Sequence, residues 1–487
     1  MCTIATKSPL ARLRSKVQRP PSADKIIIAR QSDGLGERLN ALLNAMRLSD
    51  LLGVDYRFTW PMGIVAKSPH HAIVPAEEIF TADFLAAHLI DHRDTANGFE
   101  LLAGPDDDLD SVRAQLAAAE RGLRVPARPL STRIDPEAVP AITRGFADEF
   151  AAVGFQPQIL AAIEAARSVP LGEGSVGLHL RAGDILFGRY RTWTHSWYKI
   201  VSPPVARALI ERNRATGSEV LVFGQDAELI GELCTSTGAI DVSVIRESHH
   251  LTRTGEAIFD LVLLSRCERI VAGHSGFAIQ AASIAASSVH NHLDLIPPEE
   301  VIELTRDDMA RNGDRYNPVH REFAWWAAFY GARHDLDYTT ATELLTYAFT
   351  ADPTNPRARL HLAALHYAHG KPELGDDVLV DALLADVDMG GKTLASVLLF
   401  SLLTVRGYDM REILDDITGA ADAGSGPAVL YRAGLMAERA DADSAARDVA
   451  SFRAFAAQDA RLTELDQLDA MIDRTIQKRL DRPGHVW

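Results

Sequence analysis

The feature that most constrains the fold is a strand, a glycine turn, a helix and a second strand near the start of the chain. Residues 25–30 (Lys-Ile-Ile-Ile-Ala-Arg) form a β-branched run typical of a buried strand. The glycines of residues 31–36 permit a tight turn, and a helix is expected over 37–52. Gly53 is placed to end that helix before a second strand at 54–60. This order predicts a βαβ unit on a parallel sheet.

The same alternation returns further along the chain. The pattern predicts strands at residues 175–180, 219–224, 241–245 and 269–273, with helices at 156–168, 204–215, 227–237, 257–267 and 276–286. Between the two halves, the acidic residues 106–110 are expected to form a solvated loop. We therefore expect an α/β protein with two facing Rossmann-like domains.

The last third of the chain is expected to be almost entirely helical. Residues 351–356 (Ala-Asp-Pro-Thr-Asn-Pro) precede an apolar helix at 357–368, and Gly370 separates it from a partner helix at 372–384. This pattern resembles the tetratricopeptide repeat (TPR), whose helix pairs stack into a solenoid. Residues 390–476 are compatible with further, degenerate pairs.

The length of the chain implies several domains, because 487 residues are too many for one core. We expect a disordered lead at 1–23 and an N-terminal Rossmann-like domain at 24–168. A second, C-terminal Rossmann-like domain is expected at 169–320, followed by the TPR-like helical domain at 321–487.

The composition excludes several classes of protein. A net charge of −16 disfavours nucleic-acid binding through a general basic surface, although it allows a local basic pocket for a phosphate. The three cysteines Cys2, Cys234 and Cys267 are scattered and predict a reducing compartment, and no zinc motif is present. No apolar run is long enough to span a bilayer, and the first residues lack a signal-peptide core. We expect a cytoplasmic protein, with a basic membrane-touching arm as the alternative for the lead.

Four polar stretches each follow an expected strand and precede an expected helix. They are residues 33–38 (Asp-Gly-Leu-Gly-Glu-Arg), 179–184 (His-Leu-Arg-Ala-Gly-Asp), 225–226 (Gln-Asp) and 274–276 (His-Ser-Gly). Ligands bind outside the carboxyl ends of parallel strands, so these stretches are candidates for chemistry. Arg181 can donate a charge-assisted fork to a phosphate, and Ser275 with the following amides forms a helix-start anion site.

Three motifs in the same order resemble those of GT-B fucosyltransferases. They are the glycine-rich loop at residues 34–39, the His-x-Arg-x-Gly-Asp motif at 179–184, and the stretch at 260–277, where an Asp is followed at a set distance by Ser and Phe. The resemblance covers residues 25 to about 300. It is nearest to the α1,6-fucosyltransferases, including the rhizobial nodulation enzymes, and to the protein O-fucosyltransferases.

This resemblance implies inverting, metal-independent transfer of fucose from GDP-fucose, with no cofactor besides the donor. It implies that the domain at 24–168 is on the acceptor side and that the domain at 169–320 binds the nucleotide sugar. It implies that Arg181 clamps the β-phosphate as it leaves, that His179 contacts the nucleotide and that Asp260 holds the guanine. The other residues implied to bind the nucleotide sugar are Gly34, Gly36, Arg38, Asp184, Asp226, His274, Ser275, Gly276 and Phe277.

The chain departs from the family pattern where a catalytic base might be sought. Several α1,6 members place a Lys directly after the central motif, whereas Ile185 and Leu186 follow Asp184 here. The protein O-fucosyltransferases have an acid in the first loop, which makes Asp33 and Glu37 the candidate bases, with Asp33 preferred.

Purely structural interpretations remain open for several of these residues. His179 could be a hydrogen-bonded core histidine, and Arg181 with Asp184 could form a structural ion pair. Asp226 could simply cap its helix, and Asp260, in the middle of a helix, could lie on a solvated face. Glu37 is favourable at a helix start whatever else it does.

Two other kinds of function also remain open. The chain could transfer sugar from another GDP-, UDP- or CMP-sugar, or it could be a non-catalytic TPR-like scaffold with a degenerate transferase fold. The acceptor could be a polysaccharide, a chitin oligomer, a lipid-linked glycan or a protein hydroxyl. The helical region could recruit an acceptor or a protein partner.

Overall fold

The structure is a computed structural model that describes residues 25–62, 73–102, 104, 108–188, 191, 194–355, 357–388, 410–462 and 466–481. Its contacts divide the chain into two compact units. Unit 1 holds the described residues up to His179, together with Arg212–Ile230 and Gly238–Asn291. Unit 2 holds Leu180–Glu211, Gly231–Thr237 and the described residues from His292 onward. The lead expected at 1–23 lies outside the described residues, and the four-domain division stays a prediction.

The first βαβ unit is confirmed. Strand β1 (Ile26–Ala29) is followed by helix α2 (Leu35–Leu52) and strand β2 (Tyr56–Phe58), which pairs with β1 in parallel. Gly53 ends α2 in the left-handed region at a φ of 71°, which glycine adopts without steric cost. Strands β3 (Phe99–Leu101) and β4 (Gly122–Val125) complete a four-stranded parallel sheet in the order β2-β1-β4-β3.

The chain between β2 and β5 also forms short helices and turns. They are α3 (Ala76–Ile79), α4 (Ala82–His88), η2 (His92–Thr95), α5 (Leu109–Ala118), η3 (Leu130–Thr132), η4 (Pro140–Ile142), α6 (Ala147–Ala152) and α7 (Pro157–Ser168), and α7 packs against the later helix α12. The acidic stretch predicted as a loop over 106–110 is partly wrong, because Asp110 lies in α5 and Asp108 caps that helix by accepting from Ser111 N at 2.7 Å. The rest of that stretch contains residues outside the description.

The second sheet has five strands. They are β5 (Val176–Leu180), β6 (Val220–Gly224), β7 (Ile240–Asp241), β8 (Arg269–Ala272) and β9 (Val289–Asn291), in the order β7-β6-β5-β8-β9. The pairs β5–β8, β6–β7 and β8–β9 are parallel. Counted along the chain this order is 3-2-1-4-5, a Rossmann arrangement whose direction of winding changes between β5 and β8.

The strand predicted over 241–245 is confirmed only at Asp241, the last residue of β7, and is wrong for the remainder. Helix α11 (Val242–Glu247) occupies most of that range, because Asp241 is its N-cap and accepts from Ser243 N at 2.8 Å. The other helices around the second sheet agree with the predicted pattern or extend it. They are α8 (Gly183–Leu186), η5 (Thr194–Lys199), α9 (Pro203–Ala215), α10 (Ala227–Thr237), α12 (Arg253–Arg266), α13 (Gly276–Ala285) and α14 (His292–Leu295).

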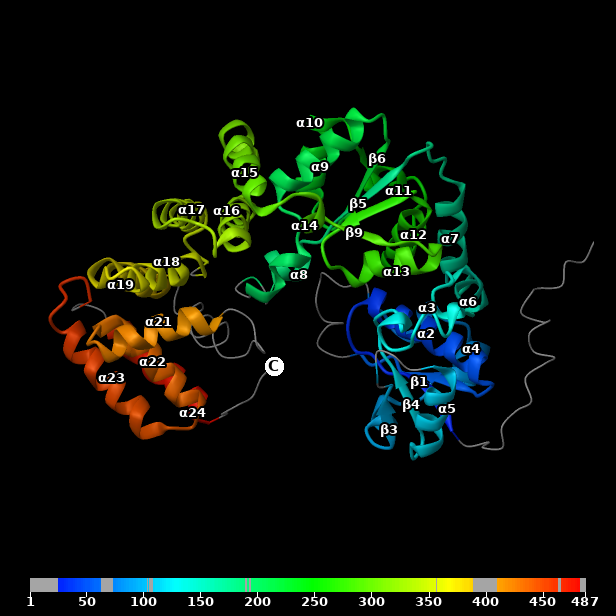
Figure 1. The fold of residues 1–487 in the computed structure, drawn as a ribbon, viewed down its shortest axis with the longest axis horizontal. Helices are drawn as coiled ribbons and strands as arrows, with labels where there is room; N and C mark the ends of the chain where they lie inside the picture. Colours follow the sequence, from blue (N-terminus) through cyan, green and yellow to red (C-terminus); the bar gives the residue numbers. More distant parts are fainter. Residues whose placement is uncertain are drawn as a thin grey trace, which may run out of the picture. The chain divides into compact units, whose positions relative to one another are not determined.

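Both sheets belong to unit 1 and share one hydrophobic core. This core runs from Ile27 of β1 through the α2 leucines to Ala282 of α13, and helix α13 packs against α2 (Figure 1). A buried ion pair adds to it: Arg47 of α2 donates to Glu149 of α6 at 2.6 Å, with side chains only 2% and 3% exposed. Breaking such a pair from one side leaves an uncompensated buried charge, which costs about 3–5 kcal/mol.

The chain from residue 298 onward is helical wherever the structure describes it, apart from the connecting turns. Its elements are α15 (Pro298–Asn312), η6 (Gly313–Arg315), α16 (Pro318–Ala332), α17 (Tyr338–Ala351), α18 (Arg357–Ala368), α19 (Pro372–Asp388), α21 (Met410–Asp422), α22 (Gly426–Glu438), α23 (Ala442–Ala456) and α24 (Asp466–Leu480). The predicted pair around Gly370 is confirmed as helices α18 and α19. Its TPR-like character stays a prediction. Among the described helices, none is both long and apolar enough to cross a membrane.

Candidate functional site

The winding of the second sheet changes direction between β5 and β8. Two of the polar stretches named from the sequence, residues 179–184 and 274–276, lie at the carboxyl ends of these two strands. His179 on β5 lies in register with Ala272 on β8, so the residues after both strands leave the same edge of the sheet. The His179 ring stacks on Phe277, with ring centroids 5.3 Å apart and planes 23° from parallel. The structure therefore brings the His of the central motif and the Phe of the third motif together.

The N-termini of α2 and α13 meet through two glycines. A Cβ atom on Gly36 would lie 2.9 Å from Phe277 Cα and 3.0 Å from Phe277 N, which is closer than backbone atoms tolerate. A Cβ on Gly276 would lie 2.9 Å from Glu37 Cγ. Asn40, one turn into α2, donates from Nδ2 to Gly276 O at 3.4 Å. Glycine at both positions is thus the condition for the close approach of the first and third motifs.

Positive charge gathers at this junction. Each helix N-terminus carries roughly half a positive charge, and the Glu37 side chain beside Gly276 supplies negative charge that offsets part of it. Ser275, the N-cap of α13, is fully buried, and its side chain makes no cap hydrogen bond. Within the described part of the chain, Ser275 Oγ has no hydrogen-bond partner, which is uncommon for a buried hydroxyl.

Asp260 of α12 does not lie on a solvated face. The residue is 9% exposed, and its Oδ2 accepts from Nη1 of Arg246, at the end of α11, at 2.5 Å. Its Oδ1 is buried and has no hydrogen-bond partner among the described residues. Burial raises the pKa of Asp260 to about 7, against the opposing attraction of Arg246. A buried carboxylate oxygen without a donor is an acceptor available to a ligand.

The first loop is shaped by Arg38 of α2. Its Nε donates to Asp33 O at 2.7 Å, its Nη2 to Ser32 O at 3.0 Å and to Pro61 O at 2.9 Å, and its guanidinium lies 5.0 Å from the centre of the Trp60 ring. Burial lowers the pKa of Arg38 to about 10. These contacts give Arg38 a loop-holding role in the structure.

The other predicted residues fall into different surroundings. Asp33 is exposed and Gly34 is the N-cap of α2, whereas Glu37 is half-buried with its side chain against Gly276. Asp226 caps α10 by accepting from Leu229 N at 3.1 Å, the structural role left open for it. His274 is exposed at the end of the β8 turn.

Arg181 and Asp184 lie in the segment that follows β5. Arg181 is half-buried and follows the last strand residue directly, and it belongs to unit 2. Asp184 is in α8, and its side chain lies outside the described part of the structure.

Three functional candidates were missed from the sequence. Arg246 is 14 residues from its partner Asp260 and on another helix, so no local spacing signals the pair. Asn40 is one helical turn from Gly36, a spacing that could have identified it. Gln280 is fully buried on α13, and neither polar atom of its amide has a partner in the described chain.

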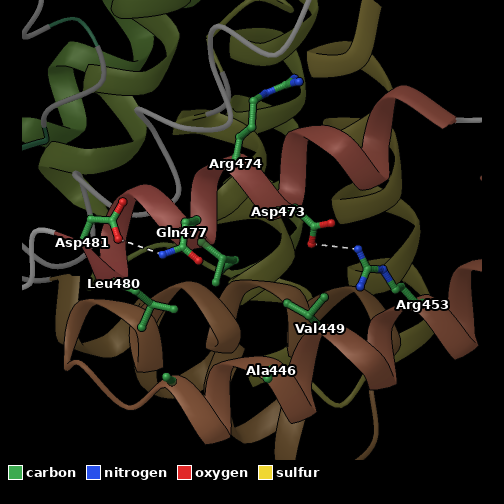
Figure 2. Close-up of a pocket in the computed structure, with 10 residues that line it drawn as sticks. Ala446, Val449, Arg453, Asp473, Arg474, Gln477, Leu480 and Asp481 are labelled. Atoms are coloured by element: carbon green, nitrogen blue, oxygen red, sulfur yellow. Dashed lines mark hydrogen bonds and ion pairs between the residues drawn. The ribbon is translucent and has the colours of Figure 1, made fainter.

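A cavity of about 800 Å³ lies between α23 and α24 in unit 2 (Figure 2). Small and apolar side chains such as Ala446 and Val449 line it, and Figure 2 shows the Arg453–Asp473 ion pair at its rim. It contains none of the residues predicted for the site. Among the described residues, no group of three or more His, Cys, Asp or Glu side chains is placed to hold a metal ion.

Comparison with known proteins adds structural likeness only. No family model and no curated protein sequence matches the chain. The fucosyltransferase NodZ from Bradyrhizobium is 16% identical, over 53% of this chain and 93% of that one, with a TM-score of 0.31. An Arabidopsis thaliana FUT1 mutant in complex with GDP is 14% identical over 57% and 72%, with a TM-score of 0.35. POFUT1 in complex with GDP-fucose is 11% identical over 56% and 98%, with a TM-score of 0.27. At these scores the likeness indicates neither a substrate nor a mechanism.

Proposed function

We propose that the chain is a glycosyltransferase that transfers a sugar from a nucleoside diphosphate sugar, with L-fucose from GDP-fucose as the favoured case, to a hydroxyl group of a glycan or protein acceptor. The observation that carries the proposal is the junction of two helix N-termini at Gly36 and Gly276, beside the buried hydroxyl of Ser275. This junction belongs to the part of the second sheet where nucleotides bind in open α/β folds. Positive helix ends, backbone amides and a hydroxyl are the groups that hold a diphosphate.

Each residue of the proposed site has a distinct role. Arg181 forms a charge-assisted fork with the β-phosphate and stabilises the charge that develops as the diphosphate leaves. The amides at the start of α13 and Ser275 Oγ hold the phosphates, and the ring of His179 contacts the nucleoside. Asp260 Oδ1 accepts from the N–H edge of guanine, which presents two adjacent donors. The positive charge needed at the leaving group then comes from Arg181 and the amides.

The proposed transfer is a single displacement. A carboxylate removes the proton of the acceptor hydroxyl, the acceptor oxygen bonds to the anomeric carbon, and the bond from that carbon to the diphosphate breaks with inversion. Asp33 and Glu37 remain the candidate bases. The contact of Glu37 with Gly276 favours Glu37, because it lies at the helix junction while Asp33 is exposed in the loop.

The experiment that tests this function is a panel of nucleotides. Thermal shifts with GDP, ADP, UDP, CMP and GDP-fucose measure ligand binding by the folded state, and donor hydrolysis measures turnover. Stabilisation by GDP and GDP-fucose with hydrolysis of GDP-fucose supports the proposal. Preference for UDP or CMP would assign another donor to the same fold. If the protein binds none of these nucleotides and does not hydrolyse GDP-fucose, the alternative of a non-catalytic scaffold is favoured.

The affinity for GDP is expected to fall below pH 7. The pKa of Asp260 is raised to about 7, so its carboxylate becomes protonated below that pH. The protonated group is a weaker acceptor and lacks the negative charge that favours hydrogen bonds from guanine. If only the ionised form binds, the dissociation constant rises about tenfold for each pH unit below that value. Calorimetry from pH 5.5 to 8 measures this slope.

The Asp260→Asn variant is the control for this slope. Phosphate ionisation contributes to both proteins, so the difference between wild type and variant isolates Asp260. The variant is expected to bind GDP weakly, with a flatter pH profile and less preference for GDP over ADP. Identical profiles in the two proteins would remove Asp260 from base recognition.

A further inference from the structure

The segment that directly follows Arg181 is built into the helical region of unit 2. Ala182, Ile185 and Leu186 are 3%, 4% and 2% exposed, and they belong to the same apolar core as Trp326 of α16 and Leu362 of α18. Helix α8 contacts α16 within this unit (Figure 1). The residues that set the position of the Arg181 backbone are therefore held by the C-terminal helices.

The turn after Arg181 is short and depends on this packing. Ile185 N and Leu186 N both donate to Ala182 O at 3.0 Å, and Phe187 N donates to Gly183 O at 2.9 Å. A single four-residue helical turn is not stable by itself in water, because its nucleation cost is not offset. The Phe187 ring adds an edge-on contact to His320 of α16, with ring centroids 5.5 Å apart.

A polar clamp reinforces the apolar contact. Arg191, further along the same segment, forms an ion pair with Asp352 and donates from Nη2 to Thr354 Oγ1 at 2.8 Å. Asp352 is only 5% exposed at its side chain and lies in the connection between α17 and α18. Asn355 of the same connection donates to Arg191 O at 3.4 Å. The connection between α17 and α18 thus binds both the side chain and the backbone of Arg191.

The helices that carry this clamp are themselves fixed by a second buried ion pair. Arg357 of α18 donates from Nη2 to both carboxylate oxygens of Glu322 on α16, at 2.7 and 2.9 Å. The two side chains are 4% and 1% exposed, and the Arg357 guanidinium lies 3.7 Å from the centre of the Trp326 ring. Helices α16 and α18 therefore form a rigid support for the α8 turn and for the Asp352 connection.

We propose that helices α16–α18 are part of the donor-binding machinery, because they hold the turn that positions Arg181. Arg191 and Asp352 are positioning residues in this role. The inference rests on the proposed function of Arg181 as the phosphate-binding residue. Its physical basis is that a displacement of about 1 Å in a charged group at a reacting centre can cost about 10²-fold in rate.

The test compares Asp352→Asn with Asp473→Asn in the full-length chain. The control removes the carboxylate of Asp473 on α24, which forms an ion pair with Arg453 on α23 at 2.8 Å. This pair is largely exposed and lies within the same helical region. Hydrogen exchange of the amides of Ile185, Leu186 and Phe187 reports directly on the α8 turn. In Asp352→Asn we expect these amides to exchange about tenfold faster, the hydrolysis of GDP-fucose to fall by up to about 10²-fold, and the dissociation constant for GDP to rise by a smaller factor. Asp473→Asn should change none of these.

Conservative substitution of Arg191 keeps the test informative if Asp352→Asn folds poorly. Arg191→Lys retains the charge and is expected to protect the α8 amides and bind GDP better than Arg191→Gln. Unchanged exchange in the Asp352 and Arg191 variants would overturn the inference. Faster exchange with unchanged hydrolysis of GDP-fucose and unchanged GDP affinity would show that the clamp is structural only, which also overturns it. A wild-type protein that binds no nucleotide would instead overturn the proposed function, a result seen before any variant is made.

Discussion

Arg181→Ala is expected to lower the hydrolysis of GDP-fucose by about 10²–10³-fold, the cost of removing one preorganised donor from a developing negative charge. In its proposed role the guanidinium would stabilise the leaving diphosphate more than the bound substrate, so the loss should fall mainly on kcat, with a smaller rise in the dissociation constant for GDP. Steady-state hydrolysis and calorimetry with GDP measure the two effects separately.

Two further variants define the role of Arg181. Arg181→Lys keeps a positive charge but loses the planar fork, so its activity should lie between wild type and Arg181→Ala. Arg311→Ala, which removes an exposed arginine of the same unit that forms an ion pair with Asp307 at 3.0 Å, is the matched control and should behave as wild type. Equal hydrolysis by wild type and Arg181→Ala would assign the phosphate to another group.

Gly36→Ala is expected to destabilise unit 1 by roughly 1–3 kcal/mol, the usual cost of overpacking a tight contact. The added Cβ would meet Phe277 Cα at 2.9 Å and Phe277 N at 3.0 Å, and backbone atoms at the start of α13 cannot move aside as a flexible side chain can. Hydrogen exchange of the α2 and α13 amides is the suitable measurement, because a chain with two compact units need not unfold in one step.

Two other glycines provide a graded comparison. Gly276→Ala should cost less than Gly36→Ala, because the nearest atoms belong to the Glu37 side chain, which can rotate. Gly231→Ala, in α10 with nothing within 4 Å of the added Cβ, should be neutral or stabilising by up to about 1 kcal/mol, the difference in helix propensity. Equal effects at all three positions would mean that the α2–α13 contact is not tight.

Periodicity in the sequence predicts most of the fold because the signal is local. The isoleucine run of β1, the helix that Gly53 ends and the strands β5, β6 and β8 follow from apolar patterns and from residues that end helices. The errors in secondary structure occurred where an aspartate carboxylate accepts a hydrogen bond from a backbone N–H and so starts a helix. Asp241 and Asp108 each cap a helix, which converted an expected strand and part of an expected loop into helical turns.

The candidate site was predictable as a set of motifs but not as an arrangement. His179, Phe277, Gly36 and Gly276 could be named because they belong to three motifs whose order and spacing resemble those of the GT-B fucosyltransferases. Their mutual contacts, and the differing surroundings of Asp33 and Glu37, depend on how α13 packs against α2. The pairing of Asp260 with Arg246 depends likewise on the packing of two separate helices.

The sequence by itself determined the parallel α/β character of the first part of this protein, its helical last part and the residues proposed to bind an anion. These properties depend on propensity, periodicity and side-chain chemistry within about one turn or one strand. Only the tertiary structure decided that two glycines bring α2 and α13 into contact, that Asp260 is buried beside Arg246 and that the turn after Arg181 packs into α16–α18. Those results depend on contacts between residues far apart in the chain, whose free energy appears only once the core has formed.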